Sequence, residues 1–73
     1  MNTKFTWGDE VKTKKLDGKG KEIDVYAAVV GITPIETDAQ AEHFKAPVGT
    51  VFYLIEFGDG SDALVQEEQL EAM

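Results

Sequence analysis

The chain has no cysteine and no arginine, and it contains only one histidine and one serine. Without cysteine the protein can form neither disulfides nor thiolate metal sites, which fits a reducing compartment. The lone His43 and the lone Ser61 cannot supply a nucleophile together with a base and an orienting partner. We therefore expect a protein that is not an enzyme.

Long apolar runs are also missing from the 73 residues. No stretch approaches the roughly 20 apolar residues that a membrane helix needs, and residues 1–7 lack the apolar core of a signal peptide. We expect a soluble, cytoplasmic protein with no membrane partner.

Metal and cofactor sites have little support in the sequence. The run Asp59-Gly60-Ser61-Asp62 lacks the regular oxygen ligands of a calcium loop, and its acids suit a turn. A single histidine without further ligands seldom binds a metal tightly, so His43 is expected at the surface or partly packed. No metal and no cofactor are expected.

Acidic residues dominate the charge of the chain. Fourteen acids face seven lysines, which gives a formal net charge of -7. Residues 1–21 hold six of the lysines and three acids, whereas residues 22–73 hold one lysine and eleven acids. Affinity for nucleic acid depends on lysine and arginine, so no nucleic acid partner is expected and a basic protein is favoured. The alternative is that the acids only keep a small domain soluble.

Two strands joined by a tight turn are predicted over residues 49–65. Residues 51–57 are apolar and aromatic, as in a buried strand, and Asp59-Gly60 can supply the positive backbone angles of a short hairpin. Alternate residues of this strand face opposite sides, so Tyr53 and Ile55 share one face while Phe52 and Leu54 share the other. Either the segment 33–49 covers Phe52 and Leu54, or they form an exposed apolar patch.

Two further strands are predicted upstream. Apolar and polar residues alternate up to Leu16, which indicates an edge strand with lysines on one side, followed by a glycine turn at residues 17–20. A second strand region runs from Glu22 to Ile32 and ends at Pro34. Its small residues Ala27, Ala28 and Gly31 predict a bend or a close backbone approach.

The connection over residues 33–49 is either a short helix or a loop. Thr37 and Gln40 have the spacing of a capping box, which favours a helix from Asp38 to Lys45 that stops at Ala46-Pro47. So short a helix needs tertiary contacts, so Phe44 must dock if the helix forms.

A single helical turn at Glu67–Gln69 is predicted near the C-terminus, with Leu70 pointing inward and a short strand or tail after it. Short strands joined by glycine turns in a chain of this length indicate one domain, residues 1–73, that is mostly β. The predicted architecture is a small antiparallel SH3-like barrel of about five strands.

Four stretches of the chain carry a resemblance to a known family. They are the entry Trp7-Gly8-Asp9-Glu10-Val11, the strand end Val29-Val30-Gly31-Ile32, the hairpin Tyr53-Leu54-Ile55-Glu56-Phe57-Gly58-Asp59-Gly60, and the closing Val65-Gln66-Glu67-Glu68-Gln69-Leu70. Over roughly Phe5 to Leu70 the chain resembles the small immunity proteins of bacterial polymorphic toxin systems, in particular the immunity protein 31 family. The resemblance implies an SH3-like barrel that binds and neutralises a cognate toxin, and it implies no functional residue.

Acidic and aromatic side chains are the candidate contacts for a protein partner, and a basic toxin domain is one candidate for that partner. The candidate partner-binding residues are Trp7, Tyr26, Tyr53, Glu56, Asp59, Asp62, Glu67 and Glu68. Two alternatives stay open: a regulatory or peptide-binding SH3-like module with a groove of Trp7, Tyr26 and Tyr53, and a small structural subunit of a larger complex. We expect a monomer or a weak dimer, since a bare strand edge favours pairing.

Overall fold

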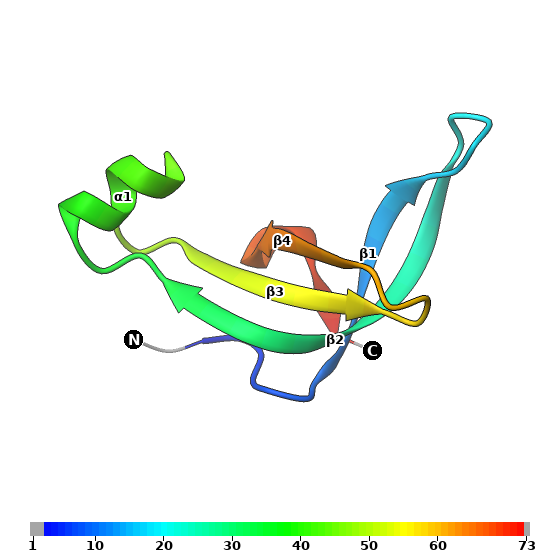
Figure 1. Cartoon of the computed structure of the whole chain (residues 1–73), viewed down its shortest axis with the longest axis horizontal. Coiled ribbons are helices and arrows are strands. Elements are labelled where there is room, and N and C mark those ends of the chain that lie inside the picture. The colour runs from blue at the N-terminus through cyan, green and yellow to red at the C-terminus, as the bar shows by residue number, and fades with distance from the viewer. Residues whose placement is uncertain (1–2, 73) are drawn as a thin grey trace.

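The computed structural model describes residues 3–72 and has a mostly β fold (Figure 1). Its elements are β1 (Glu10–Leu16), β2 (Glu22–Pro34), α1 (Asp38–Phe44), β3 (Val51–Phe57), β4 (Asp62–Gln66), the 3-10 turn η1 (Glu67–Gln69) and β5 (Glu71–Ala72). All strand pairs are antiparallel, and the single sheet has the order β4-β3-β2-β1-β5. The prediction of a small antiparallel β fold with about five strands is confirmed. The sheet curls without closing, because β4 and β5 lie at its two ends and do not pair in the described part of the chain.

The β3–β4 hairpin turns through a loop of residues 58–60. Phe57 N–H donates to Ser61 C=O at 2.8 Å, and Gly60 N–H donates back to Phe57 C=O at 3.0 Å. Only Gly60 has a positive φ, 88°, in this loop. The turn is therefore a three-residue turn with a glycine bulge, and the expectation that Asp59-Gly60 would share the positive angles holds for Gly60 alone.

β2 bends at the small residues that predict a bend. Its register with β3 shifts between Val29 and Gly31, which leaves Val30 as an extra residue. A Cβ on Gly31 would lie 3.2 Å from Cβ of Leu54, so the two strands approach closely at this point. Such a bulge raises the local twist, and β2 is visibly curved in Figure 1.

β1 is not the outermost strand that the alternating pattern predicts. β5 pairs with it at Val11 and Lys12, so the start of β1 lies inside the sheet. At the next residue of β1, the hydroxyl of Thr13 donates a hydrogen bond to Gln69 C=O at 2.9 Å, so this position of the edge also has a contact. From Lys14 onward no strand lies along this edge in the described residues.

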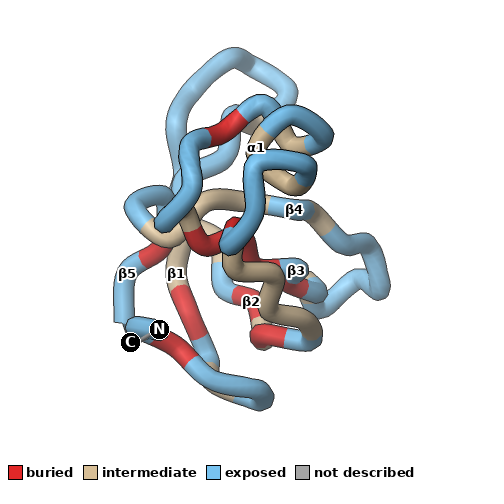
Figure 2. Tube along the Cα trace, turned by 90° about the vertical axis from the view of Figure 1, so that its left-hand side faces the viewer, coloured by how far each residue is buried: buried red, intermediate tan, exposed pale blue. Residues whose placement is uncertain are grey.

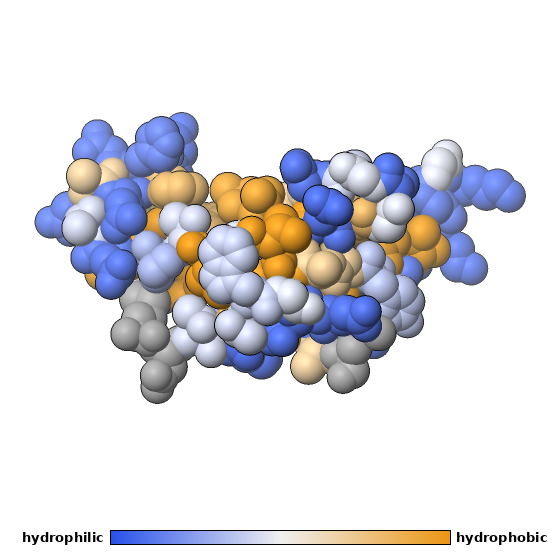
Figure 3. All heavy atoms as spheres, turned by 60° about the horizontal axis from the view of Figure 1, so that its bottom comes forward, coloured by the Kyte–Doolittle hydropathy of each residue, from blue (hydrophilic) through white to orange (hydrophobic). Residues whose placement is uncertain are grey.

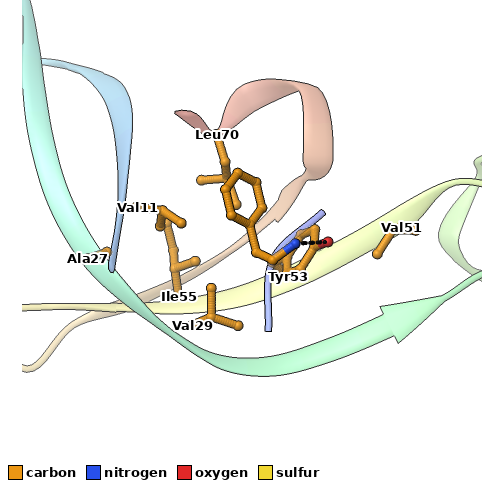
Figure 4. Close-up of a cluster of buried hydrophobic side chains, with 8 residues drawn as sticks. Val11, Ala27, Val29, Val51, Tyr53, Ile55 and Leu70 are labelled. Carbon is orange, nitrogen blue, oxygen red and sulfur yellow. Dashed lines mark hydrogen bonds between the residues drawn. The ribbon is translucent and has the colours of Figure 1, made fainter. Parts of the chain in front are cut away.

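Buried positions of the main core gather where β1, β2 and β3 come together (Figure 2). Tyr53 and Ile55 are fully buried at its centre, and Leu70 is 2% exposed, as predicted for the C-terminal turn. The buried members are Phe5, Val11, Ala27, Val29, Val51, Tyr53, Ile55 and Leu70 (Figure 4). Strands from both halves of the sequence therefore contribute to one core.

A second, smaller cluster lies under α1. The helix begins at the predicted capping box, where Thr37 Oγ1 accepts the Gln40 N–H at 3.2 Å, and ends at Lys45, which has a φ of 55°. Phe44 packs against Phe52, with the ring centroids 5.2 Å apart. The helix alternative is therefore correct for residues 38–44. The segment covers Phe52 but leaves Leu54 36% exposed.

We predict that Gly60→Ala lowers the free energy of unfolding by about 1 kcal/mol, because an L side chain at this positive φ is strained. Gly58→Ala is the matched control, since Gly58 lies in the same loop, has no positive φ and has open space around it. It should change stability by less than about 0.5 kcal/mol. Urea unfolding of both variants measures the difference, and equal losses would show that backbone conformation does not explain the need for glycine.

Candidate functional site

The convex, outer face of the sheet carries the candidate site. Along β1 to β4, core residues alternate with residues whose side chains lie on this outer face. Phe52 belongs to this face too, but α1 covers it. The uncovered residues of the face that matter here are Glu10, Tyr26, Ala28, Val30, Leu54, Glu56, Asp62 and Leu64.

Three carboxylates line up across four strands. Glu10 is paired with Ala28, Ala28 with Glu56, and Glu56 with Asp62. We call Glu10, Glu56 and Asp62 the acidic row. Directly opposite residues have Cβ atoms about 5 Å apart, so Glu56 and Asp62 repel each other, while Glu10 and Glu56 are about 10 Å apart across Ala28. All three are exposed.

The acidic row has no lysine partner among residues 3–72. The ion pairs of this part of the chain join Lys12 to Glu71 at 3.2 Å and Lys14 to Asp24 at 2.6 Å. The second pair lowers the pKa of Asp24, chiefly through the hydrogen bond from Lys14. These lysines thus neutralise other acids, and the charge of the row is left facing solvent.

A shallow hollow of about 330 Å³ lies between Glu10 and Glu56. Tyr26 forms one wall of the hollow. Ala28 of β2 lies between the two carboxylates, because it is paired with Glu10 on one side and with Glu56 on the other. Tyr26 is 57% exposed, so most of its ring is available for contact. The small methyl group of Ala28 keeps the hollow open. The hollow can therefore accept a side chain that is cationic and has an apolar stem.

Apolar residues lie on the other side of the acidic row. Leu54 is paired with Gly31 and with Leu64, and Leu64 is 49% exposed. Val30, the extra residue of the bulge, is 37% exposed beside them. In Figure 3, apolar side chains gather in the middle of the molecule, with hydrophilic side chains at both ends. Exposed apolar surface bordered by charge is typical of a protein-binding site.

The structure brings together Tyr26, Glu56 and Asp62 from the residues predicted to bind a partner. Sequence reasoning missed Glu10. Its alternation with Lys12 and Lys14 shows that these three residues share a face of β1, but only the pairing with Ala28 places Glu10 in line with Glu56.

Tyr53 is not a surface residue, so its predicted partner-binding role is wrong. It is fully buried because its strand position faces the core. Its hydroxyl donates to Glu67 Oε2 at 2.6 Å and accepts the Phe5 N–H at 3.2 Å, the bond dashed in Figure 4. The groove of Trp7, Tyr26 and Tyr53 that a peptide-binding module would use therefore does not exist.

Glu67, also predicted to contact a partner, is partly buried and makes hydrogen bonds within the protein. Besides the Tyr53 hydroxyl, its Oε2 accepts the Lys4 N–H at 3.1 Å, which ties the N-terminal segment to η1. These hydrogen bonds, the one from Tyr53 first, lower the pKa of Glu67. Burial, helped by the bond to Glu67, raises the pKa of Tyr53.

The remaining predicted contacts are not members of the acidic row. Trp7 is 67% exposed on a turn that Gly8 N–H fastens to Val29 C=O at 2.9 Å. Asp59 accepts the Ser61 hydroxyl at 2.6 Å, and this bond lowers the pKa of Asp59 at the tip of its turn. Glu68 lines a separate hollow whose walls include Lys12 and Lys14.

Comparison with family models, curated proteins and solved structures found no match to this chain. No helix in the described residues has the length and apolar character needed to cross a membrane. Residues 3–72 also contain no group of three acidic or histidine side chains arranged to hold a metal ion. His43 is exposed and lies edge-on to Phe44, as expected for a surface histidine.

We predict that Tyr53→Phe lowers stability by about 1 to 2 kcal/mol near neutral pH, because the buried Phe5 N–H loses its acceptor and Glu67 loses a donor. Because the pKa of Glu67 is lower in the folded state than in the unfolded state, its ionised carboxylate stabilises the fold at pH values above the ordinary carboxyl pKa. This stabilisation is lost as the pH falls through the folded-state pKa. The difference between wild type and variant should therefore narrow between about pH 5 and about pH 3. Urea unfolding across this range measures it.

Tyr26→Phe is the control for that prediction, since the Tyr26 hydroxyl makes no hydrogen bond within residues 3–72. Its stability should match wild type at each pH. A gap for Tyr53→Phe that is constant with pH would contradict the coupling to Glu67.

We predict that Glu56→Gln raises the free energy of unfolding by about 0.2 to 1 kcal/mol, because it removes the repulsion from Asp62 directly across the strand pair. Asp62→Asn should do the same, and the double variant should gain less than the two single gains combined, since both remove one repulsion. Glu42→Gln, on the exposed side of α1, is the control. Urea unfolding of the four variants gives the coupling, and full additivity would show that the two carboxylates do not interact.

Proposed function

We propose that this chain is a non-catalytic binding protein of the immunity type, which neutralises a cognate bacterial toxin by covering a basic surface of that toxin. One observation carries the proposal: the acidic row has no counter-charge among residues 3–72, and it lies between exposed Tyr26 and the exposed pair Leu54–Leu64. The resemblance over Phe5 to Leu70 points to the same role.

A lysine or arginine of the partner fits the hollow between Glu10 and Glu56. Its charged end would lie between two carboxylates, and its stem would lie on Ala28 and the ring of Tyr26. Tyrosine binds cations through its ring face, and arginine can pair with a carboxylate through two parallel hydrogen bonds. Apolar contacts at Leu54 and Leu64 would exclude water from this pair, which is the arrangement that gives interface hot spots their strength.

The stability of the free protein argues for the same use of the acidic row. Opposed carboxylates at Glu56 and Asp62 destabilise the sheet, and lysines nearby are paired elsewhere. A basic partner would replace this repulsion by attraction. The net charge of -7 would also speed the encounter with such a partner through long-range attraction.

Co-expression with each gene product encoded next to this gene tests the proposal, and we expect one of these products to be toxic to the cell. The full chain should restore growth of cells that produce the toxin. The variant Glu10→Gln/Glu56→Gln/Asp62→Asn should bind with an association rate at least about tenfold lower and should protect poorly. The control removes three exposed acids elsewhere, as Glu22→Gln/Glu36→Gln/Glu42→Gln, and it should protect as wild type does.

Filling the hollow supplies a second test that leaves the charge unchanged. Ala28→Leu should speed dissociation of the toxin complex, because the larger side chain fills the hollow. Tyr26→Ala should do the same, because it removes the aromatic wall that a cationic side chain would contact. Circular dichroism checks that each variant is folded. The proposal is wrong if no neighbouring gene product is toxic, or if the acidic-row and control variants protect equally.

A further inference from the structure

The free edge of β4 is the strongest unexplained feature of the fold. β4 pairs with β3 on one side, and no strand lies along its other side in residues 3–72. On the inner face of the curled sheet, a hollow of about 290 Å³ is lined in part by Phe57, Ala63 and Val65 and also by Thr13, Lys14 and Lys15 of β1, so the free edge follows from the strand pairing alone.

Backbone groups of Asp62 and Leu64 point outward along the free edge. Phe57 N–H donates to Ser61 C=O, which shows that Ser61 turns its backbone groups toward β3. Because hydrogen-bonded positions alternate in antiparallel pairs, Ala63 and Val65 also face β3, and Asp62 and Leu64 face away. The Gln66 N–H, which also faces away, is held by Gln69 Oε1 at 2.9 Å.

β4 has few of the features that block the approach of another strand, and Asp62 is its one charged residue. Its residues, Asp62 to Gln66, include no lysine, no proline and no glycine, and its register with β3 runs without a bulge. Natural edge strands are usually protected by such features. The opposite end of the sheet differs, since β5 is only two residues long and β1 carries Lys12, Lys14 and Lys15.

We propose that the β4 edge pairs with the β4 edge of a second copy of this chain, antiparallel about a two-fold axis at Leu64. In this register Leu64 lies opposite Leu64 of the second copy, Ala63 opposite Val65, and Asp62 opposite Gln66. The outward N–H and C=O of Leu64 bond in both directions, and the Asp62 N–H donates to the Gln66 C=O of the other copy. No like charges face each other.

The same register joins the exposed apolar residues of the two copies. In the dimer, Leu54 lies beside Leu64 in each copy, and the two Leu64 side chains lie beside each other across the two-fold axis. The four leucines therefore form a single apolar row across the outer face of both sheets. The acidic row stays exposed on each copy. The inference therefore stands independently of the proposed function.

The dimer is expected to be weak and to strengthen with salt. One short strand makes a small interface, and each chain carries a net charge of -7. The two Asp62 residues would be about 14 Å apart, beyond the Debye length of about 8 Å at physiological ionic strength. Salt therefore removes most of the repulsion between the copies while the backbone hydrogen bonds remain.

Sedimentation equilibrium of the full chain from about 10 μM to about 1 mM, at low and at high NaCl, tests the proposal. Wild type should dimerise reversibly, and more strongly at high salt. Leu64→Lys should weaken the dimer about tenfold or more, because two lysines then meet at the two-fold axis. Leu16→Lys, which changes another exposed leucine on the other hairpin, should dimerise as wild type does.

Mixing Leu64→Lys with Leu64→Glu should restore a dimer of one chain of each kind, which only a contact between the two Leu64 positions explains. In wild type, the amide NMR signals of Asp62 and Leu64 should shift with protein concentration, while those of residues 18–20 stay fixed. A wild-type chain that is monomeric at about 1 mM in high salt overturns the proposal. So does a dimer that Leu64→Lys leaves intact.

Discussion

The register of β3 between β2 and β4 is the constraint on which the rest of the structure depends. Successive residues of β3 alternate between the main core, with Tyr53 and Ile55, and the outer face, with Leu54 and Glu56. A slip by one residue would bury Glu56 and expose Tyr53, with the loss of the whole core. The bulge at Val30 and the glycine turn at Gly60 hold this register from either side.

The outer face combines features that do not serve the stability of the sheet. Acids oppose each other at Glu56 and Asp62, and large apolar side chains at Leu54 and Leu64 remain in contact with water. Elsewhere in the protein, an acidic side chain has a counter-charge and an outer-face aromatic side chain is shielded from water: Lys14 pairs with Asp24, and α1 covers Phe52. This contrast between the two regions supports the proposal that a partner covers the outer face.

The incomplete closure of the sheet creates two unlike ends. At the β1 end, β5 and the bond from Thr13 to Gln69 satisfy part of the edge, and lysines protect the remainder. At the β4 end the backbone of Asp62 and Leu64 is bare. The bare edge and the acidic row meet at Asp62, so a partner on the outer face and a second copy at the edge would occupy adjoining surfaces.

Local patterns in the sequence determined most of the secondary structure. Thr37 and Gln40 favoured α1 while a loop stayed open, and Asp59-Gly60 predicted the hairpin, because caps and turns depend on residues within a few positions of each other. The inward position of Leu70 and the two faces of β3 follow from the same short-range periodicity. Only the tertiary structure decided which face of β3 is the core, since both faces of Val51–Phe57 are apolar enough to be buried. The tertiary structure also aligned Glu10 with Glu56 and placed Glu67 within hydrogen-bonding distance of the Tyr53 hydroxyl. Local patterns could not predict these arrangements, because they join separate elements of the chain and depend on the register of the sheet.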